Sequence, residues 1–373
     1  MSFYYKLWQE EPETRKRIAS GLRELRDHLK PGAENRGVPT RTLDRNLLLA
    51  TWNIREFDSE KFGPRCPDCF YFIAEIINHF DLVAIQEVRE NLRALNRVQD
   101  ILGGWWKYLV TDVTYGRSGN GERLAFLYDS RKVSFSGLAG EIVLPDRGGE
   151  RALQLARTPF MCGFRAGWTK FNICSVHIYY GQSRADDPRR IEEIRELARL
   201  LVDRVGGPAL QPDTPGTRNA SGENLILLGD FNIFNREEDE TMRVLEEPGF
   251  VVPPPVRYTH TNAVKNKQYD QIAFLKRTNR FDYEGAAGVF DFYGAVFREE
   301  DEAAYSAIRN NQGRNFKEWR TYQMSDHLVL WTEIRTDYSD EYLEELEQGA
   351  RNTNGANGRR PAKKKAAGGG PVR

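Results

Sequence analysis

Polar residues capable of acid–base and metal chemistry stand at the boundaries of short apolar runs in this sequence. The end of a strand holds a side chain rigidly and still leaves it at a surface, which is what a preorganised site requires. Six such points occur in chain order: Trp52-Asn53, Gln86-Glu87, Val176-His177, Gly229-Asp230-Phe231-Asn232, Tyr269-Asp270 and Ser325-Asp326-His327. Each point alone is weak evidence, because charged residues flank strands in most proteins and a lone histidine is more often structural than catalytic.

The elements that must position these residues follow from the periodicity of apolar residues. Three- and four-residue spacing predicts helices over 12–30, 70–80, 89–102 and 188–205, and a shorter helix is predicted over 237–247. Apolar runs predict strands at 47–52, 82–85, 106–111, 123–128, 132–135, 169–176, 224–228, 269–275 and 327–334. Because strands outnumber long helices, the pattern predicts two packed sheets flanked by helices rather than a purely parallel sheet.

Length and composition narrow the class of protein. The chain has 373 residues, with 54 Lys and Arg against 54 Asp and Glu, and 40% of it is hydrophobic, so it can bury a full core. No apolar run approaches the ~20 residues that span a bilayer, and the first residues lack the order of a secretory signal. Four cysteines make no disulfide framework, and the pair Cys66 and Cys69 lacks the partners of a zinc site. We therefore expect a cytoplasmic protein with reduced thiols and no membrane association.

The charge is distributed unevenly along the chain. Seven basic residues and no acidic one follow Glu347, so the chain before them carries 47 basic against 54 acidic residues. This tail is also rich in glycine, asparagine and alanine, which predicts disorder over 350–373. A basic arm could tether the protein to nucleic acid through phosphates, or it could simply aid solubility, and both readings stay open.

Taken in order, the six points together with Gly121-Glu122-Arg123 resemble the endonuclease/exonuclease/phosphatase family, to which DNase I belongs. The resemblance covers residues 45–336. It implies an α/β (α+β) fold, a four-layered sandwich of two mostly antiparallel packed sheets flanked by helices, with the site at one rim between the sheets. It also implies divalent-metal-dependent cleavage of phosphate esters. Around this domain we expect an N-terminal helical extension over 1–44 and a C-terminal helix over 337–349.

The metal site is expected around Glu87. Hydrolysis of a phosphodiester needs charge neutralised on the phosphoryl oxygens, a nucleophilic water and a proton for the leaving oxygen. Glu87 and Asn53 offer a hard, all-oxygen partial cage, and Asp326 is a further candidate ligand. Mg²⁺ prefers such a site, with Mn²⁺ and Ca²⁺ as alternatives.

A tight turn after an apolar strand carries Asp230 and Asn232, so both side chains can reach one water or one phosphate. The resemblance implies that Asp230 orients or deprotonates the attacking water and that Asn232 donates a hydrogen bond to the phosphate. The alternative is that both residues cap the next helix, a position that Asp and Asn favour.

Two histidines carry the remaining acid–base interpretation. The resemblance pairs His327 with Asp270 and His177 with Glu122. A carboxylate behind an imidazole fixes its tautomer and raises its pKa, so each pair would present a nitrogen to the phosphate or the leaving group. The other three histidines, His28, His79 and His260, lie outside the motifs and receive no role.

Departures from the family's branches narrow the substrate. His177 stands where the abasic-site repair branch tends to have tyrosine, and the Trp-Cys-Asp-Arg pattern of inositol-phosphate phosphatases is replaced by Tyr269-Asp270-Gln271. Between the last two motifs, residues 278–324 interleave aromatic residues with arginine. Such a stretch could stack on bases, but an extra strand–helix packing unit is the favoured interpretation.

The first functional hypothesis is a Mg²⁺-dependent phosphodiesterase that acts on DNA as an endonuclease. The alternative is a phosphatase or phosphodiesterase of small-molecule or lipid phosphoesters, sphingomyelinase-like or inositol-phosphate-like. A third is a catalytically silent binding module, which the complete set of site residues disfavours. The acidic body weakens the nucleic-acid hypothesis, and the basic tail partly restores it.

Overall fold

A computed structural model describes the chain over 2–32, 37–57, 59, 61–115, 120–146, 154–205, 223–236, 239–278, 280–283, 285–309 and 314–347. The chain divides into two units, Met1–Asp337 and Tyr338–Arg373. Within the second unit the structure describes the helix α8 (Ser339–Glu347). The basic tail predicted over 350–373 lies outside the described residues.

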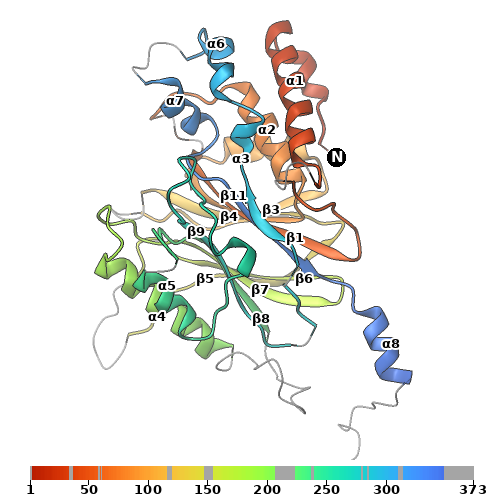
Figure 1. The fold of residues 1–373 in the computed structure, drawn as a ribbon, viewed down its shortest axis with the longest axis vertical. Helices are drawn as coiled ribbons and strands as arrows, with labels where there is room; N and C mark the ends of the chain where they lie inside the picture. The colour runs from red at the N-terminus through yellow and green to blue at the C-terminus, as the bar shows by residue number, and fades with distance from the viewer. Residues whose placement is uncertain are drawn as a thin grey trace, which may run out of the picture. The chain divides into compact units, whose positions relative to one another are not determined.

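Two mixed sheets form the centre of the first unit (Figure 1). The six-stranded sheet has the order β10-β11-β1-β2-β4-β3, and the five-stranded sheet has the order β5-β6-β7-β8-β9. All pairs are antiparallel except β1 with β2 and β7 with β8. The strands are β1 (Asn46–Phe57), β2 (Leu82–Arg89), β3 (Trp106–Val110), β4 (Glu122–Asp129), β5 (Val133–Glu141), β6 (Phe160–Ala166), β7 (Thr169–His177), β8 (Asn224–Asp230), β9 (Asp270–Leu275), β10 (Ala287–Phe290) and β11 (Val329–Arg335).

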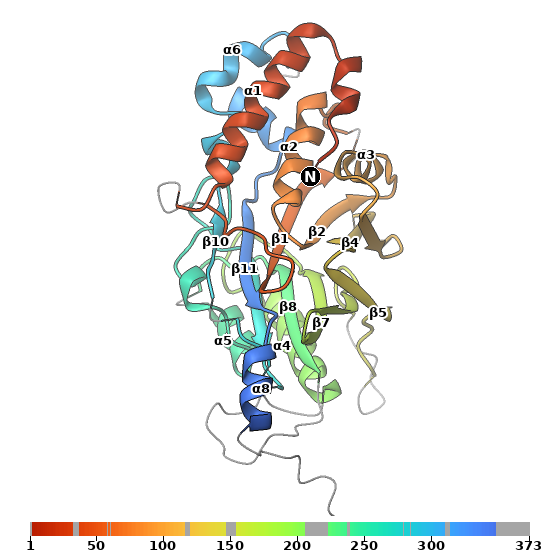
Figure 2. The ribbon, with the colours of Figure 1, turned by 90° about the vertical axis from the view of Figure 1, so that its right-hand side faces the viewer.

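Helices cover the outer face of each sheet. The helices α1, α2, α3, α6 and α7 lie by the six-stranded sheet, while α4 and α5 lie by the five-stranded one (Figures 1 and 2). The helices are α1 (Pro12–Leu29), α2 (Pro67–Asn78), α3 (Arg93–Leu102), α4 (Pro188–Arg204), α5 (Glu240–Glu246), α6 (Glu302–Tyr305) and α7 (Phe316–Gln323), with short 3₁₀ turns at Tyr5–Gln9, Pro254–Val256, Phe292–Gly294 and Glu299–Asp301. The predicted four-layered architecture is confirmed.

The apolar run at the start of β1 explains why the layers stack in this way. Leu47 and Leu49 belong to the core between the two sheets, whereas Leu48 and Ala50 belong to the core under α1, α2 and α3. Successive strand residues point to opposite faces, so a strand buried on both faces must be apolar at every position. Helix α1 contributes to the outer core with Ile18, Leu22, Leu25 and Leu29, all of them buried.

The stretch between the last two motifs forms β10, α6 and α7, as the favoured interpretation predicted. Its aromatic rings pack on one another: the centroids of Phe297 and Tyr305 are 4.6 Å apart, and Trp319 lies 5.7 Å from Tyr305. These three side chains are buried in the outer core. They therefore stabilise the fold rather than offer stacking faces to bases.

A group of buried charges lies beside the first residues of β1 and β2, at the opposite ends of these strands from the predicted site. We call Arg41, Asp81, Asp129 and Lys132 the base cluster. Asp81 accepts hydrogen bonds from Arg41 Nε (2.7 Å), from Lys132 Nζ (2.6 Å) and from the Leu48 N–H (2.8 Å), and Arg41 Nη2 reaches Asp129 Oδ2 at 2.7 Å. Every carboxylate of the base cluster has a cationic partner.

Among the described helices, none is long and apolar enough to cross a membrane.

Candidate active site

The ends of β1 and β2 bring Asn53 and Glu87 together. These parallel neighbours pair Asn53 with Gln86 and then shift register, so Glu87 follows the last regular pair. Asn53 Nδ2 donates to Glu87 Oε1 (2.9 Å), and the Glu56 N–H donates to Glu87 Oε2 (2.8 Å). Glu87 has a φ of +60°, which residues other than glycine adopt rarely and mostly at functional sites.

The ends of β7 and β8 supply His177 and Asp230, which face each other in register. Gly229 allows this pairing, because a Cβ at that position would lie 2.1 Å from the carbonyl oxygen of Val176, and its φ is +132°. Asp230 Oδ1 accepts from the Asn232 N–H (2.9 Å), and Asn232 Nδ2 donates to the Ile178 carbonyl (2.8 Å). The next helix, α5, begins only at Glu240 after the N-cap residue Asp239, so Asp230 and Asn232 do not cap it.

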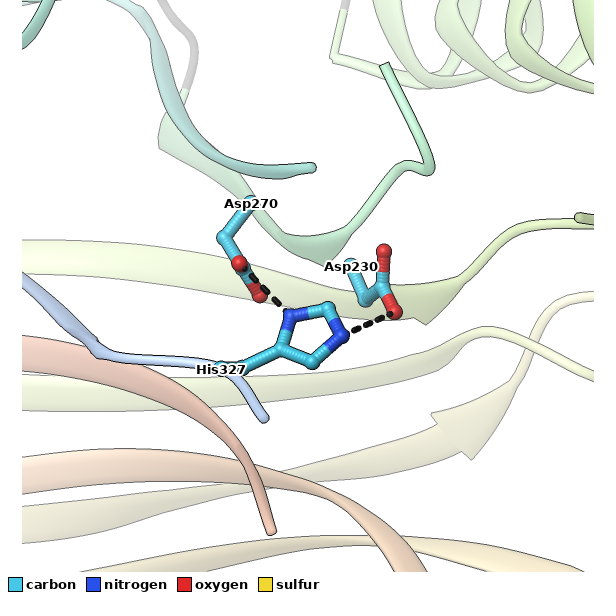
Figure 3. A group of neighbouring side chains, drawn as sticks. All are labelled: Asp230, Asp270 and His327. Atoms are coloured by element: carbon cyan, nitrogen blue, oxygen red, sulfur yellow. Dashed lines mark hydrogen bonds and ion pairs between the residues drawn. The ribbon is translucent and has the colours of Figure 1, made fainter. Parts of the chain in front are cut away.

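His327 lies between two carboxylates from the five-stranded sheet (Figure 3). Its Nδ1–H donates to Asp270 Oδ2 (2.8 Å), and its Nε2 lies 3.7 Å from Asp230 Oδ2. Burial would lower the pKa of His327, but the charges of Asp270 and Asp230 outweigh it and raise the pKa well above its usual value. Burial raises the pKa of Asp270, although His327 opposes this shift.

His177 lies on the other side of Asp230, and its Nδ1 is close to a carboxylate without a well-directed hydrogen bond among the described residues. Its Nδ1 lies 2.8 Å from Glu122 Oε2 and its Nε2 lies 3.5 Å from Asp230 Oδ2. Arg157 donates to Glu122 from Nε (2.9 Å) and from Nη2 (3.3 Å). Burial would raise the pKa of Glu122, but His177, Arg157 and Arg89 lower it far below its usual value. Glu122 therefore stays ionised behind the imidazole.

Asp230 Oδ2 is the point at which the groups converge. Asn53 Nδ2 donates to it at 3.0 Å, and the Nε2 atoms of both histidines lie within 3.7 Å of it. The contacts from Asn53 and His327 cross from one sheet to the other, whereas His177 and Asp230 belong to the same sheet. We call Asn53, Glu87, His177, Asp230 and His327 the rim, and all of its members are buried apart from Glu87, which is partly exposed.

No cationic side chain in the described part of the chain forms an ion pair with Glu87, whose contacts are amide groups. Burial and then the charge of Glu122 raise the pKa of Glu87. Asn53 Oδ1 is buried and has no hydrogen-bond partner among the described residues. An orphaned amide oxygen beside an under-neutralised carboxylate fits a hard divalent cation. Asp326 is the most exposed candidate ligand, its side chain is 42% exposed, and Arg55 Nε lies 3.6 Å from its Oδ2.

The ligand atoms of Asp230, Asp270 and His327 also lie within 4.8 Å of one another, as in a metal site (Figure 3). Asp270 and His327 already share a hydrogen bond through His327 Nδ1, so their proximity does not require a metal. Asp230 Oδ2 lies between Asn53 and the two histidines, so it can contact a ligand from either direction.

The structure links eight of the nine residues that the sequence singled out by direct contacts: Asn53, Glu87, Glu122, His177, Asp230, Asn232, Asp270 and His327. The Asp326 side chain contacts Arg55, and the side-chain amide of Asn232 donates to the Ile178 carbonyl. Sequence reasoning missed Arg157, which lies in an irregular segment with no periodicity and no motif. It also missed Tyr269 as a contact of His327, although the rings are 5.5 Å apart. The apolar run after Tyr269 predicted that this residue stands at the start of a strand. Nothing in the sequence indicated that its ring lies near His327.

Comparisons with known proteins define the class of fold. No protein-family model matches the sequence, and no curated protein sequence matches it. Among solved structures, an endonuclease/exonuclease/phosphatase family protein from Bacteroides thetaiotaomicron is similar with a TM-score of 0.50 at 14% identity, covering 79% of this chain and 99% of that one. The catalytic domain of human Nocturnin with bound sulfate matches with a TM-score of 0.50 at 14% identity, covering 78% and 94%. Humanised D. rerio TDP2 matches with a TM-score of 0.48 at 11% identity, covering 78% of this chain and 98% of that one.

The chain has the DNase I-like fold of the endonuclease/exonuclease/phosphatase proteins, as its motifs predicted. At 14% identity the likeness establishes the fold. The function that we propose below is based on the residues of the rim.

Proposed function

We propose that the chain is a divalent-metal-dependent phosphoesterase that hydrolyses phosphodiester bonds of DNA as an endonuclease. The observation that carries this proposal is the convergence of two carboxylate-backed imidazoles on Asp230, next to the under-neutralised pair Asn53 and Glu87. Structural histidines have no reason to share one carboxylate oxygen.

The cation would be held by Glu87 and Asn53, with Asp326 at the open side, and it would supply positive charge to the phosphoryl oxygens. Asp230 lies where it can orient a water and accept the water's proton as the oxygen attacks phosphorus. The raised pKa of His327 keeps its imidazole protonated near neutral pH, so His327 can give a proton to the leaving oxygen. His177 would present its Nε2 to the phosphate, while Glu122 fixes its ring.

A plasmid-nicking assay with Mg²⁺ and with EDTA tests the proposal. We expect relaxed and linear DNA to form with Mg²⁺ and none to form with EDTA. Failure of Mg²⁺, Mn²⁺ and Ca²⁺ alike to support nicking would contradict a DNA substrate.

The second candidate is a phosphoesterase of small-molecule or lipid head-group esters with the same residues. It is favoured by the acidic excess of the chain before the tail, which opposes contact with a phosphate backbone. Release of phosphate or phosphocholine from small substrates, without nicking, would support this candidate.

A further inference from the structure

A cavity of about 620 Å³ opens beside the rim, between the loops that follow β7 and β8 and the segment that leads into β9. Its lining includes Arg184, Phe234, Asp239, Tyr258, His260 and Lys267, and we call it the basin. The mechanism above uses none of these side chains.

A row of aromatic rings connects the basin to the rim. Phe234, in the wall of the basin, has its ring centroid 5.5 Å from that of Tyr269, and the Tyr269 ring is 5.5 Å from His327. The two steps place Phe234 no more than 11 Å from His327. A strand whose scissile phosphate lies at His327 and whose backbone follows this row can therefore bring an adjacent phosphate to the basin.

The charge of the basin is suited to an anion. Lys267 Nζ lies 4.2 Å from the centroid of Phe234, and no carboxylate in the described part of the chain pairs with it. Arg184 is exposed, and among the described residues its guanidinium contacts exposed Asp186 at 3.4 Å. The imidazole of exposed His260 can donate a hydrogen bond.

The acidic residue among the described lining residues is Asp239, and it is engaged with the backbone. Its Oδ2 accepts from the N–H groups of Phe234 (3.0 Å) and Asn235 (2.9 Å). These bonds hold the loop after β8, and the backbone N–H dipoles partly offset the negative charge of the carboxylate. The cationic side chains therefore dominate the described surface of the basin.

We propose that the basin is a second anion subsite, which binds the phosphate next to the scissile one in an oligonucleotide strand. This inference rests on the proposed function and sharpens it, because the subsite selects esters with a neighbouring negative charge. A phosphocholine ester would place a quaternary ammonium near Lys267 and Arg184 instead, and like charges repel.

The test compares kcat/KM for a short single-stranded oligonucleotide with kcat/KM for bis(4-nitrophenyl) phosphate, which has one phosphate. In Lys267→Ala and Arg184→Ala, we expect the ratio of the two values to fall about 10-fold, because each variant loses a charged contact made only by the longer substrate. Lys276→Ala is the matched control: Lys276 directly follows β9, at the end of that strand away from Asp270, and its ratio should equal that of the wild type. An unchanged ratio in both basin variants would overturn the subsite.

A binding measurement separates this inference from the proposed function. Fluorescence anisotropy of the same labelled oligonucleotide in EDTA, over a series of salt concentrations, reports phosphate contacts without turnover. Lys267→Ala should lower the slope of log affinity against log salt by about one, whereas Lys276→Ala should leave it unchanged. If the wild type cleaves neither substrate but Lys267→Ala still lowers the slope, the result contradicts the proposed activity and supports the subsite. A slope in Lys267→Ala equal to that of the wild type contradicts the subsite, whether or not the protein cleaves DNA.

Discussion

Strands β1 and β2 run between two groups of buried charges that are neutralised in opposite ways. In the base cluster, Asp81 meets both Arg41 and Lys132 within 2.7 Å, and the Leu48 N–H completes its hydrogen bonds. At the rim, Glu87 meets amide groups, and Asn53 leaves a buried oxygen without a partner among the described residues. The carboxylates of the first group all have cationic partners, whereas the second would gain its cationic partner from the metal that we propose. Charge balance thus distinguishes a group that stabilises the fold from a group that we propose to bind a cation.

The largest expected effect concerns His327, one of the two histidines of the rim. His327→Ala should lower kcat/KM for DNA cleavage by ~10²–10⁴-fold, because it removes the proton donor and leaves Asp270 and Asp230 without the group between them. Plasmid nicking at matched protein concentration measures this. His28→Ala, on α1 and outside the rim, is the control and should keep wild-type activity. Near-normal turnover in His327→Ala would show that the rim is not the reaction centre.

The next effect concerns the base cluster. Asp81→Asn should lower the free energy of unfolding by ~3–5 kcal/mol, because it leaves Lys132 buried beside a neutral partner. Urea denaturation followed by circular dichroism measures the change. Asp100→Asn is the matched control, because the pair of Asp100 with Lys6 is exposed, and its effect should be small. A small effect of Asp81→Asn would remove the distinction between the two groups.

Metal binding should stabilise the rim and not the base cluster. Mg²⁺ at 100 times its Kd should raise the free energy of unfolding by about 2.7 kcal/mol, and EDTA should reverse this. In Glu87→Gln the rise should be much smaller, because the variant lacks the charged ligand. Thermal unfolding with and without Mg²⁺ reports the difference, and Glu247→Gln, at an exposed carboxylate, should respond as the wild type does. An equal rise in Glu87→Gln would place the cation elsewhere.

The smallest effect is the acid response of the base cluster. Burial would raise the pKa of Asp129, but Arg131 and Arg41 lower it to about 2, against a usual value of 3.8. The stabilisation is therefore fully present above about pH 4 and is lost as the pH falls towards 2, on the order of 2 kcal/mol. Asp129→Asn should flatten unfolding free energy against pH over this interval. Asp112→Asn, at an exposed carboxylate, should keep the wild-type slope, and an unchanged slope in Asp129→Asn would contradict the assignment.

Much of the fold could be predicted because burial imposes periodicity on the sequence. The buried face of α1 follows the spacing of its four apolar residues, and the long helix predicted over 188–205 is α4. Boundaries were less predictable: α3 begins at Arg93 rather than at residue 89, because β2 continues through Arg89. Strand β6 (Phe160–Ala166) was missed, since Gly163 and Arg165 interrupt its apolar pattern.

The candidate site was predictable in its members and not in its geometry. Its residues stand at strand ends, where the sequence changes from apolar to polar, so Asn53, Glu87 and His177 could be found one by one. That Arg157 would hold Glu122 required a contact between segments 35 residues apart through an irregular loop. The basin likewise joins Arg184 to Lys267 with no shared motif, so only the assembled fold reveals it.

The rim is divided between two sheets, and one buried amide joins them beneath it. Gln86 Nε2 donates to Thr51 Oγ1 on its own sheet and to Ser175 Oγ on the other, each at 3.1 Å. The spacings of Asp230 from Asn53 and from His327 therefore also depend on the distance between the sheets, and a shift of ~1 Å in such a spacing can slow a reaction ~100-fold. An ordinary packing substitution deep in the sandwich would then present itself in the laboratory as a defect of turnover, even though it touches no reacting atom.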